Sequence, residues 1–189
     1  AAYTAVDRAD DEAERCKAVN GASVAAIAEA CAAIDAKLIY ISTDYVFAGE
    51  GERFYRPEGA KGPRNVYGRT KLSGELAVQA ALTKFFIVRI SWVFGIHGKN
   101  FIRTMLQLAK SHDTLTVVAD QVGSPTYTVD LARLLVDMAA SDRYGIYHAT
   151  NEGTCSWAEL AAEVFRQRSL GVKVVPVPGL VTTSILPPT

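Results

Sequence analysis

Two residues of complementary chemistry, Tyr67 and Lys71, stand four positions apart in a segment whose pattern predicts a helix. Residues at this spacing lie on one face of a helix, so the two side chains are neighbours. A free tyrosine has a pKa of about 10, too high for proton transfer at neutral pH, and a neighbouring ammonium lowers it by stabilising the phenolate. We therefore interpret the pair as a candidate general acid or base, although the spacing alone is a weak signal.

A second candidate group lies 24 residues earlier, where an apolar run ends in the polar sequence Ser42, Thr43, Asp44 and Tyr45. Polar side chains at the carboxyl end of a strand in an open α/β sheet lie where ligands bind. The alternative is a plain Ser/Thr/Asp turn that ends the strand. The position of these residues alone leaves both interpretations open. The Tyr67/Lys71 pair follows this turn in the next predicted helix, and this order favours a catalytic role for the pair.

The elements that position these residues follow from two apolar runs, 37–42 and 85–90, which are rich in β-forming residues. Such runs are typical of strands buried on both faces of a parallel sheet. A polar loop over 49–65 and a helix over 66–82 separate them. Strand, crossover helix and strand make a βαβ unit, so the sequence predicts an α/β fold with a parallel sheet.

The rest of the chain continues this alternation less regularly. We expect helices over 10–33 with a break near Gly21, over 101–110, over 127–140, and over 156–168 from a capping box of Ser156 and Glu159. Short strands are expected over 115–118, 146–149 and 173–176, and no element over 180–189. Trp157 follows the cap, and we interpret it as a core residue.

Composition excludes several classes of protein. The chain has 189 residues, 49% of them hydrophobic, and 20 basic against 20 acidic side chains, so its net charge is zero. This argues against a nonspecific nucleic-acid or membrane binder. No apolar run approaches about 18 residues and no signal peptide is recognisable. The three cysteines are odd in number and widely spaced, so we expect a reducing cytosol and a cytoplasmic protein. Neither a disulfide framework nor a metal motif is formed by Cys16, Cys31, Cys155, His97, His112 and His148.

Several linked motifs resemble one family. They are Ala1–Ala9, Ser42–Phe47 (STDYVF), Asn65–Lys71 (NVYGRTK), Arg89–Gly95 (RISWVFG) and Asp120–Tyr127 (DQVGSPTY). In this order they resemble the extended, nucleotide-sugar branch of the short-chain dehydrogenase/reductase superfamily, and within it the dTDP-4-dehydrorhamnose reductase family. The related 4,6-dehydratases usually carry Thr-Asp-Glu at the turn, where this chain has Tyr45 in place of the glutamate.

The resemblance implies a Rossmann-like doubly wound parallel sheet, present in part, with a smaller interleaved α/β substrate lobe. The cofactor portion would comprise 1–92 and 120–150, and the nucleotide-sugar lobe 93–119 and 151–189. The implied activity is reduction of the C4 keto group of dTDP-4-dehydrorhamnose to dTDP-L-rhamnose by NADPH or NADH, for cell-surface polysaccharide synthesis. The hydride belongs to the cofactor, and the protein supplies placement and protons.

The resemblance also assigns roles to residues. Tyr67 would donate a proton to the C4 alkoxide, Lys71 would lower the pKa of Tyr67 and bind the nicotinamide ribose, and Thr43 would hydrogen-bond the same carbonyl oxygen. Further cofactor contacts would be Ala2, Tyr3, Thr4 and Ser42. The dTDP-sugar contacts would be Asp44, Tyr45, Trp92, Asn100, Gln121, Ser124 and Thr126. Asn20 would support the structure without taking part in chemistry.

Two departures from the family pattern bear on these expectations. The Gly-rich phosphate-binding turn would precede residue 1 by about 60 residues, and the tail stops before a family arginine. We therefore expect a fragment that holds a dinucleotide poorly by itself, because the turn supplies the backbone N–H groups for the pyrophosphate. The family also brings Mg²⁺ and a homodimer into consideration, although no ligand for the metal can be assigned.

Two alternatives stay open at this point. One is another nucleotide-sugar enzyme, such as an epimerase, against which the Thr43-Asp44-Tyr45 turn argues. The other is a non-catalytic regulatory subunit like that of methionine adenosyltransferase, which has the same fold and similar motifs and acts by binding a partner enzyme. A Tyr/Lys pair does not exclude it.

Overall fold

The computed structural model describes residues 2–50 and 54–179, which divide into two compact units. The first unit consists of the described residues of Ala1–Ile90 with Leu131–Ala149, and the second of Ser91–Asp130 with the described residues of Thr150–Thr189. Residues 91–92, 120–130 and 150, which the resemblance assigns to the cofactor portion, thus cluster with the second unit. The reason is local pairing: β3 (Val93–Phe94) pairs with β6 (Thr126–Tyr127) inside the second unit.

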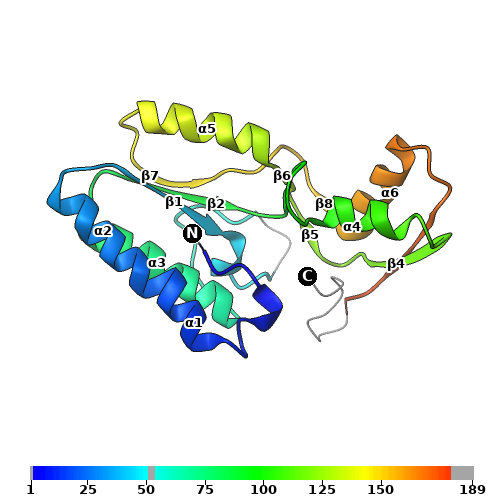
Figure 1. Ribbon diagram of the computed structural model, residues 1–189, viewed down its shortest axis with the longest axis horizontal. Helices are drawn as coiled ribbons and strands as arrows, with labels where there is room; N and C mark the ends of the chain where they lie inside the picture. The colour runs from blue at the N-terminus through cyan, green and yellow to red at the C-terminus, as the bar shows by residue number, and fades with distance from the viewer. Residues whose placement is uncertain (1, 51–53, 180–189) are drawn as a thin grey trace. The chain divides into compact units, whose positions relative to one another are not determined.

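The first unit is built on a parallel sheet of β1 (Leu38–Thr43), β2 (Phe85–Ile90) and β7 (Gly145–His148), in the order β1-β2-β7. Helices α2 (Ser23–Ala33) and α3 (Val66–Ala81) cover one face, and α5 (Thr128–Ala140) covers the other (Figure 1). This sheet with helices on both faces confirms the predicted α/β fold class.

Alternation along β2 explains why its sequence is apolar throughout. Ile87 packs into the cluster with Val78 of α3, whereas Phe86 and Val88 pack into the cluster with Met138 of α5. Successive side chains of a strand point to opposite faces, so a strand between two helical layers needs apolar residues at both parities. The apolar run over 85–90 predicts burial on both faces, and the central position of β2 in the sheet agrees with it.

The first long helix departs from its prediction at one place. Instead of a break near Gly21, the chain passes from α1 (Ala13–Lys17) through a π-helical turn, η2 (Ala18–Ala22), into α2. A short 3-10 helix, η1 (Val6–Arg8), precedes them. The wide turn carries Asn20, whose side chain is buried. Such π-helical turns often occur at functional sites.

The second unit has its own core. Strands β4 (Thr114–Val118) and β9 (Lys173–Val177) pair in parallel, and α4 (Phe101–Leu108) and α6 (Trp157–Gln167) pack on them through an apolar cluster. The predicted capping box starts α6. Two further strands, β5 (Val122–Gly123) and β8 (Cys155–Ser156), pair antiparallel. The two-residue strands are too short to show a period in the sequence, so the sequence pattern does not predict them.

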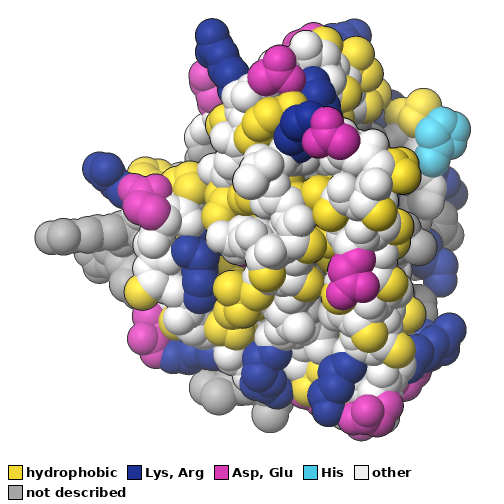
Figure 2. Space-filling model, turned by 90° about the vertical axis from the view of Figure 1, so that its left-hand side faces the viewer, with side chains coloured by type: hydrophobic (Ala, Val, Ile, Leu, Met, Phe, Trp, Pro, Cys, Tyr) yellow, Lys and Arg dark blue, Asp and Glu magenta, His cyan; other side chains and the backbone are white. Residues whose placement is uncertain are grey.

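The surface agrees with the neutral charge of the chain. Figure 2 shows basic and acidic side chains interspersed over one face, without a large patch of either sign. Within residues 2–50 and 54–179, no helix is long and apolar enough to cross a membrane.

The contact between α3, β1 and η2 generates a stability prediction at Gly74. An added Cβ there would collide with the Tyr40 hydroxyl and the Asn20 carbonyl. Alanine gains about 0.5–1 kcal/mol of helix propensity over glycine, but overpacking a tight interior costs about 1–3 kcal/mol. We expect Gly74→Ala to lower the free energy of unfolding in urea. Gly171→Ala is the control, since a Cβ at Gly171 meets open space, and equal effects of the two substitutions would contradict the prediction.

Candidate active site

Helix α3 carries Tyr67, Lys71 and Glu75 at successive intervals of four residues, and all three are buried. The Asn65 side chain caps the helix by accepting the Gly68 N–H at 2.8 Å. A Cβ on Gly68 would collide with the carbonyl oxygen of Tyr45, so the first turn of α3 lies against the turn that follows β1. Tyr67, Lys71 and Glu75 therefore form one buried stripe along α3, which begins next to the end of strand β1.

The turn after β1 is the short helix η3 (Asp44–Val46), capped by Thr43. The Thr43 hydroxyl accepts the Tyr45 N–H at 3.3 Å and donates to Asp44 Oδ1 at 3.0 Å. The Tyr45 ring meets the Tyr67 ring edge-on, with centroids 5.6 Å apart. The structure therefore brings the predicted turn and the predicted Tyr/Lys helix together in one unit.

Burial decides the protonation of the two candidate catalytic groups. It raises the pKa of Tyr67 to about 12, and the neighbouring Thr43 hydroxyl offsets only part of this effect. It lowers the pKa of Lys71 to about 8, against the opposing charge of Glu75. Desolvation disfavours whichever form is charged, so the same environment moves the two pKa values in opposite directions.

These shifts differ from the expectation that Lys71 lowers the pKa of Tyr67. The Lys71 ammonium donates to the carbonyl of Ile41 at 2.7 Å and lies 4.1 Å from the centroid of the Tyr40 ring. The net shift of the Tyr67 pKa is upward. At neutral pH the phenol is protonated, so Tyr67 can act as a proton donor, and the Lys71 ammonium is mostly charged.

An ion pair inside the first unit fixes these elements. Arg89, 2% exposed, donates from Nε and Nη2 to the two carboxylate oxygens of Glu75, 0% exposed, at 2.8 and 2.6 Å. Ser42 donates its hydroxyl to the same carboxylate at 2.5 Å. Arg89 Nη1 donates to the carbonyl of Pro57 at 2.7 Å. The network joins β1, β2, α3 and the preceding loop.

Sequence reasoning missed Glu75 and Arg89. Both are visible in the sequence pattern. Glu75 lies eight residues after Tyr67, on the same face of the helix, and Arg89 is a charged residue inside the apolar run of β2. Ser42, which the resemblance made a cofactor contact, is buried and engaged with Glu75. Its hydroxyl therefore ties the strand to the helix in this structure.

The segment 2–4, expected to flank the cofactor, is held by Asn20. Its side-chain oxygen accepts the Tyr3 N–H at 2.9 Å, and its amide donates to the Tyr3 carbonyl at 3.0 Å. Ala2 and Thr4 are exposed. Among the described residues, the Tyr3 hydroxyl is the only buried side-chain polar atom without a hydrogen-bond partner. The supporting role inferred for Asn20 thus has a geometric basis.

Most of the other predicted sugar contacts fall in the second unit, where they form hydrogen bonds with other residues of that unit. The Thr126 hydroxyl donates to the Ser91 carbonyl at 2.6 Å, and the Ser124 hydroxyl donates to the Gly153 carbonyl at 2.8 Å. Gln121 accepts the indole N–H of Trp157 at 3.2 Å.

Trp92 and Asn100 complete that set. Trp92 is half-buried and stacks on Trp157. Asn100 caps α4 by accepting the Arg103 N–H at 3.1 Å, and its amide donates to the Gly95 carbonyl at 2.9 Å. In this structure Asn100 therefore acts as the N-cap of α4.

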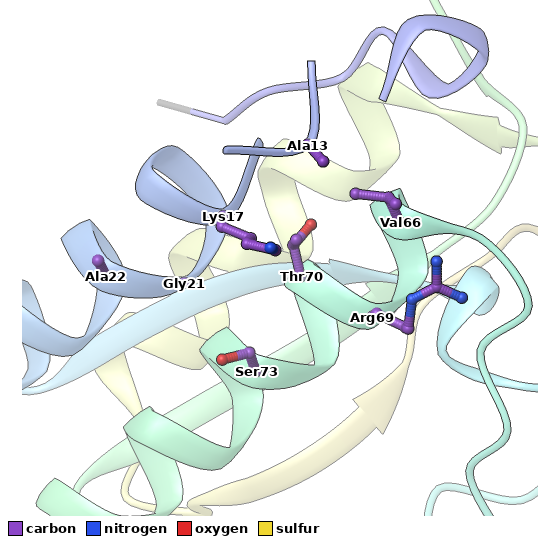
Figure 3. A pocket seen from close by; sticks show the side chains of 8 residues that line it. All are labelled: Ala13, Lys17, Gly21, Ala22, Val66, Arg69, Thr70 and Ser73. Carbon is purple, nitrogen blue, oxygen red and sulfur yellow. The ribbon is translucent and has the colours of Figure 1, made fainter. Parts of the chain in front are cut away.

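A surface hollow of about 610 Å³ lies elsewhere, between α1, η2 and α3 (Figure 3). It is lined by Ala13, Lys17, Gly21, Ala22, Val66, Arg69, Thr70 and Ser73. Lys17 pairs with Glu14, and Arg69 lies 4.0 Å from an Asp10 carboxylate oxygen. The hollow contains none of the predicted catalytic or binding residues, so we do not interpret it as the active site.

The described residues also give no support for a metal centre. Within 2–50 and 54–179, no group of three or more His, Cys, Asp or Glu side chains could hold a metal ion. The described residues therefore offer no cluster of ligands for the Mg²⁺ ion that the family resemblance suggested.

The parallel sheet with helices on both faces, and a Tyr/Lys helix at the carboxyl end of a strand, define a Rossmann-like protein of the extended short-chain dehydrogenase/reductase class. Within that class, residues 1–182 match the family model described as the RmlD substrate binding domain, and the chain belongs to this family. This match agrees with the family that the sequence motifs indicated.

Individual relatives agree with this assignment. The chain is 47% identical to a dTDP-4-dehydrorhamnose reductase of Streptomyces griseus, over 88% of this chain and 57% of the relative. It is 49% identical to the Mycolicibacterium smegmatis protein of the same name, over 87% and 51%. It matches the crystal structure of dTDP-4-dehydrorhamnose reductase from Bacillus anthracis in complex with NADP, at 42% identity and a TM-score of 0.91, over 94% and 64%. The chain thus spans about half to two-thirds of these relatives.

The ion pair at the centre of the site generates a second prediction. Removing one partner of a buried pair leaves an uncompensated charge and costs about 3–5 kcal/mol. We expect Arg89→Met to lower the free energy of unfolding by that amount. Arg89→Met with Glu75→Leu should cost much less than the two single substitutions summed, because no charge is left buried.

The matched control is Arg166→Met, which breaks the exposed pair with Glu163. Exposed pairs contribute little to stability, so its denaturation midpoint should stay unchanged. Additive effects of Arg89→Met and Glu75→Leu would show that the two side chains do not interact as described.

Proposed function

We propose that the complete protein carrying this chain reduces the C4 keto group of dTDP-4-dehydrorhamnose, forming dTDP-L-rhamnose with NADPH or NADH. One observation carries the proposal: a buried, protonated Tyr67 lies beside Thr43 at a strand end, on the same stripe as the Lys71 ammonium. The relatives named dTDP-4-dehydrorhamnose reductase supply the substrate class, which the geometry of this chain alone does not identify.

In this proposal each residue acts at a stated atom. The Tyr67 phenol donates its proton to the C4 oxygen as negative charge develops there. The Thr43 hydroxyl, which donates to Asp44 Oδ1 in this structure, would donate to the same C4 oxygen instead and stabilise that charge. The Lys71 ammonium holds the cofactor's ribose and keeps a positive charge near the phenol. With a pKa raised by burial to about 12, Tyr67 is protonated at neutral pH but is a weaker acid than free tyrosine, so its proton transfer depends on the strong basicity of the alkoxide that develops at C4.

The residues present fit the nicotinamide end of a dinucleotide. When bound, the reduced nicotinamide supplies the hydride. The chain offers a buried ammonium at Lys71, a phenol at Tyr67 and a buried Tyr3 hydroxyl that lacks a partner. The NADP complex of the Bacillus anthracis relative supports the choice of cofactor.

For the sugar, we propose the contacts that the family motifs indicate: Asp44, Tyr45 and Trp92. Asp44 is exposed to solvent as a residue. The protein around its carboxyl group nevertheless desolvates the charged form and raises its pKa. A carboxyl of this kind suits a hydrogen bond to a sugar hydroxyl.

The proton donor generates the third prediction. Tyr67→Phe removes the acid and keeps the ring, and general acid catalysis contributes about 10²–10⁴-fold. We expect kcat for NADPH or NADH consumption with dTDP-4-dehydrorhamnose to fall by that factor in the complete protein. Tyr144→Phe, which removes a hydroxyl bonded to Asp142, is the control and should keep the wild-type rate. A Tyr67→Phe protein with full activity would disprove this role.

The Lys71 pKa generates a prediction on pH. Burial favours the neutral amine, so the ammonium loses its proton from about pH 8 upward. The profile of kcat/KM reports groups of the free enzyme, and it should fall above about pH 8. Lys71→Arg keeps a positive charge at all pH values in this range. We expect that variant to be slower and to lack this alkaline limb; an unchanged limb would assign it to another group.

A further inference from the structure

Trp92 has a backbone conformation that a side chain of its size rarely adopts. Its φ angle is +46°, in the left-handed region, which Cβ contacts make unfavourable for any residue but glycine. Such strain persists only where surrounding contacts over-determine it, and it is concentrated at functional sites. The contacts around Trp92 must therefore stabilise this conformation.

The backbone on both sides of Trp92 is fixed by segment 124–126. The Thr126 N–H donates to the Trp92 carbonyl at 3.2 Å, and the Thr126 hydroxyl donates to the Ser91 carbonyl at 2.6 Å. The Ser91 hydroxyl donates to the Ser124 carbonyl, also at 2.6 Å. The strained residue is thus held by three hydrogen bonds within the second unit.

The indole of Trp92 is held separately, by two contacts. Its ring stacks on that of Trp157, with centroids 3.5 Å apart and planes inclined by 14°. Gly123 approaches the same indole so closely that an added Cβ would lie 2.7 Å from Trp92 Cε2. Only glycine leaves room for the ring in this position.

Trp157 is itself anchored to the core of the second unit. Its N–H donates to Gln121, and its ring lies 4.5 Å from that of Phe101, a buried core residue. It is the first residue of α6, directly after the Ser156 cap. A continuous line of ring contacts therefore runs from the core, through Trp157, to Trp92.

We propose that Trp157 is a positioning residue, which together with Gly123 holds the Trp92 indole in the orientation that contacts the sugar. This inference rests on the proposed function, because it takes Trp92 as a sugar contact. It changes the interpretation of Trp157 from a core residue to one that acts on substrate recognition through Trp92. It also gives Gly123, in the DQVGSPTY motif, a steric role.

The test uses Trp157→Leu and Trp157→Phe in the complete protein. Leu removes the stacking ring, whereas Phe retains one. An aromatic pair contributes about 0.5–1.5 kcal/mol beyond its buried area, which corresponds to about 2- to 12-fold in affinity. We expect Trp157→Leu to raise the sugar-nucleotide KM by up to about tenfold, with the NAD(P)H KM unchanged, and Trp157→Phe to restore most of the difference.

A spectroscopic readout reports the stack independently of turnover. Two stacked indoles give an exciton couplet in circular dichroism, which should be present in the wild type and absent from Trp157→Leu. The control is Phe165→Leu, a buried residue of the same helix that loosens the core away from Trp92. It should keep the couplet and the sugar-nucleotide KM.

Gly123→Ala tests the same geometry without altering Trp157. Its Cβ should displace the Trp92 indole and raise the sugar-nucleotide KM, whereas Gly171→Ala should not. Loss of the couplet with an unchanged KM, or equal KM increases for Trp157→Leu and Phe165→Leu, would overturn the inference and leave the proposed function standing. A wild-type protein with the couplet but no turnover would instead overturn the proposed function and, with it, this inference.

Discussion

The buried ion pair between Arg89 and Glu75 is the constraint on which the first unit depends. Two charges removed from water must satisfy each other closely, because an uncompensated buried charge costs several kcal/mol. Each of the three Arg89 side-chain nitrogens donates a hydrogen bond, two to Glu75 and one to the Pro57 carbonyl, and Ser42 donates to the same carboxylate. Strand β2, helix α3, the end of β1 and a loop must therefore assemble in one arrangement.

The chemistry of the site follows from that arrangement. Because Glu75 is fixed, the helical repeat also fixes Lys71 and Tyr67, one and two turns earlier on the same stripe. The burial that the ion pair requires extends along the stripe, and it moves the two pKa values in opposite directions. One physical cause therefore keeps the phenol protonated and makes the lysine titratable near neutral pH.

In the second unit, the main constraint is to hold the large ring of Trp92 on a strained backbone. The DQVGSPTY motif, expected to contact substrate directly, contributes hydrogen bonds and a glycine that determine where Trp92 lies. Trp157 adds the ring on which the indole rests. Residues that resemble a binding motif in sequence can thus act through a neighbour, and only their contacts distinguish the two roles.

The sequence by itself determined the α/β class, the long helices, the buried strands and the Tyr67/Lys71 pair, because periodicity, caps and spacing are local properties of the chain. It did not determine the partners of Glu75 and Arg89, the π-helical turn at Asn20 or the two-residue strands. These depend on residues that are distant in sequence, and on burial, which sets pKa values and pairs charges. Only the tertiary structure decides which polar side chain meets which.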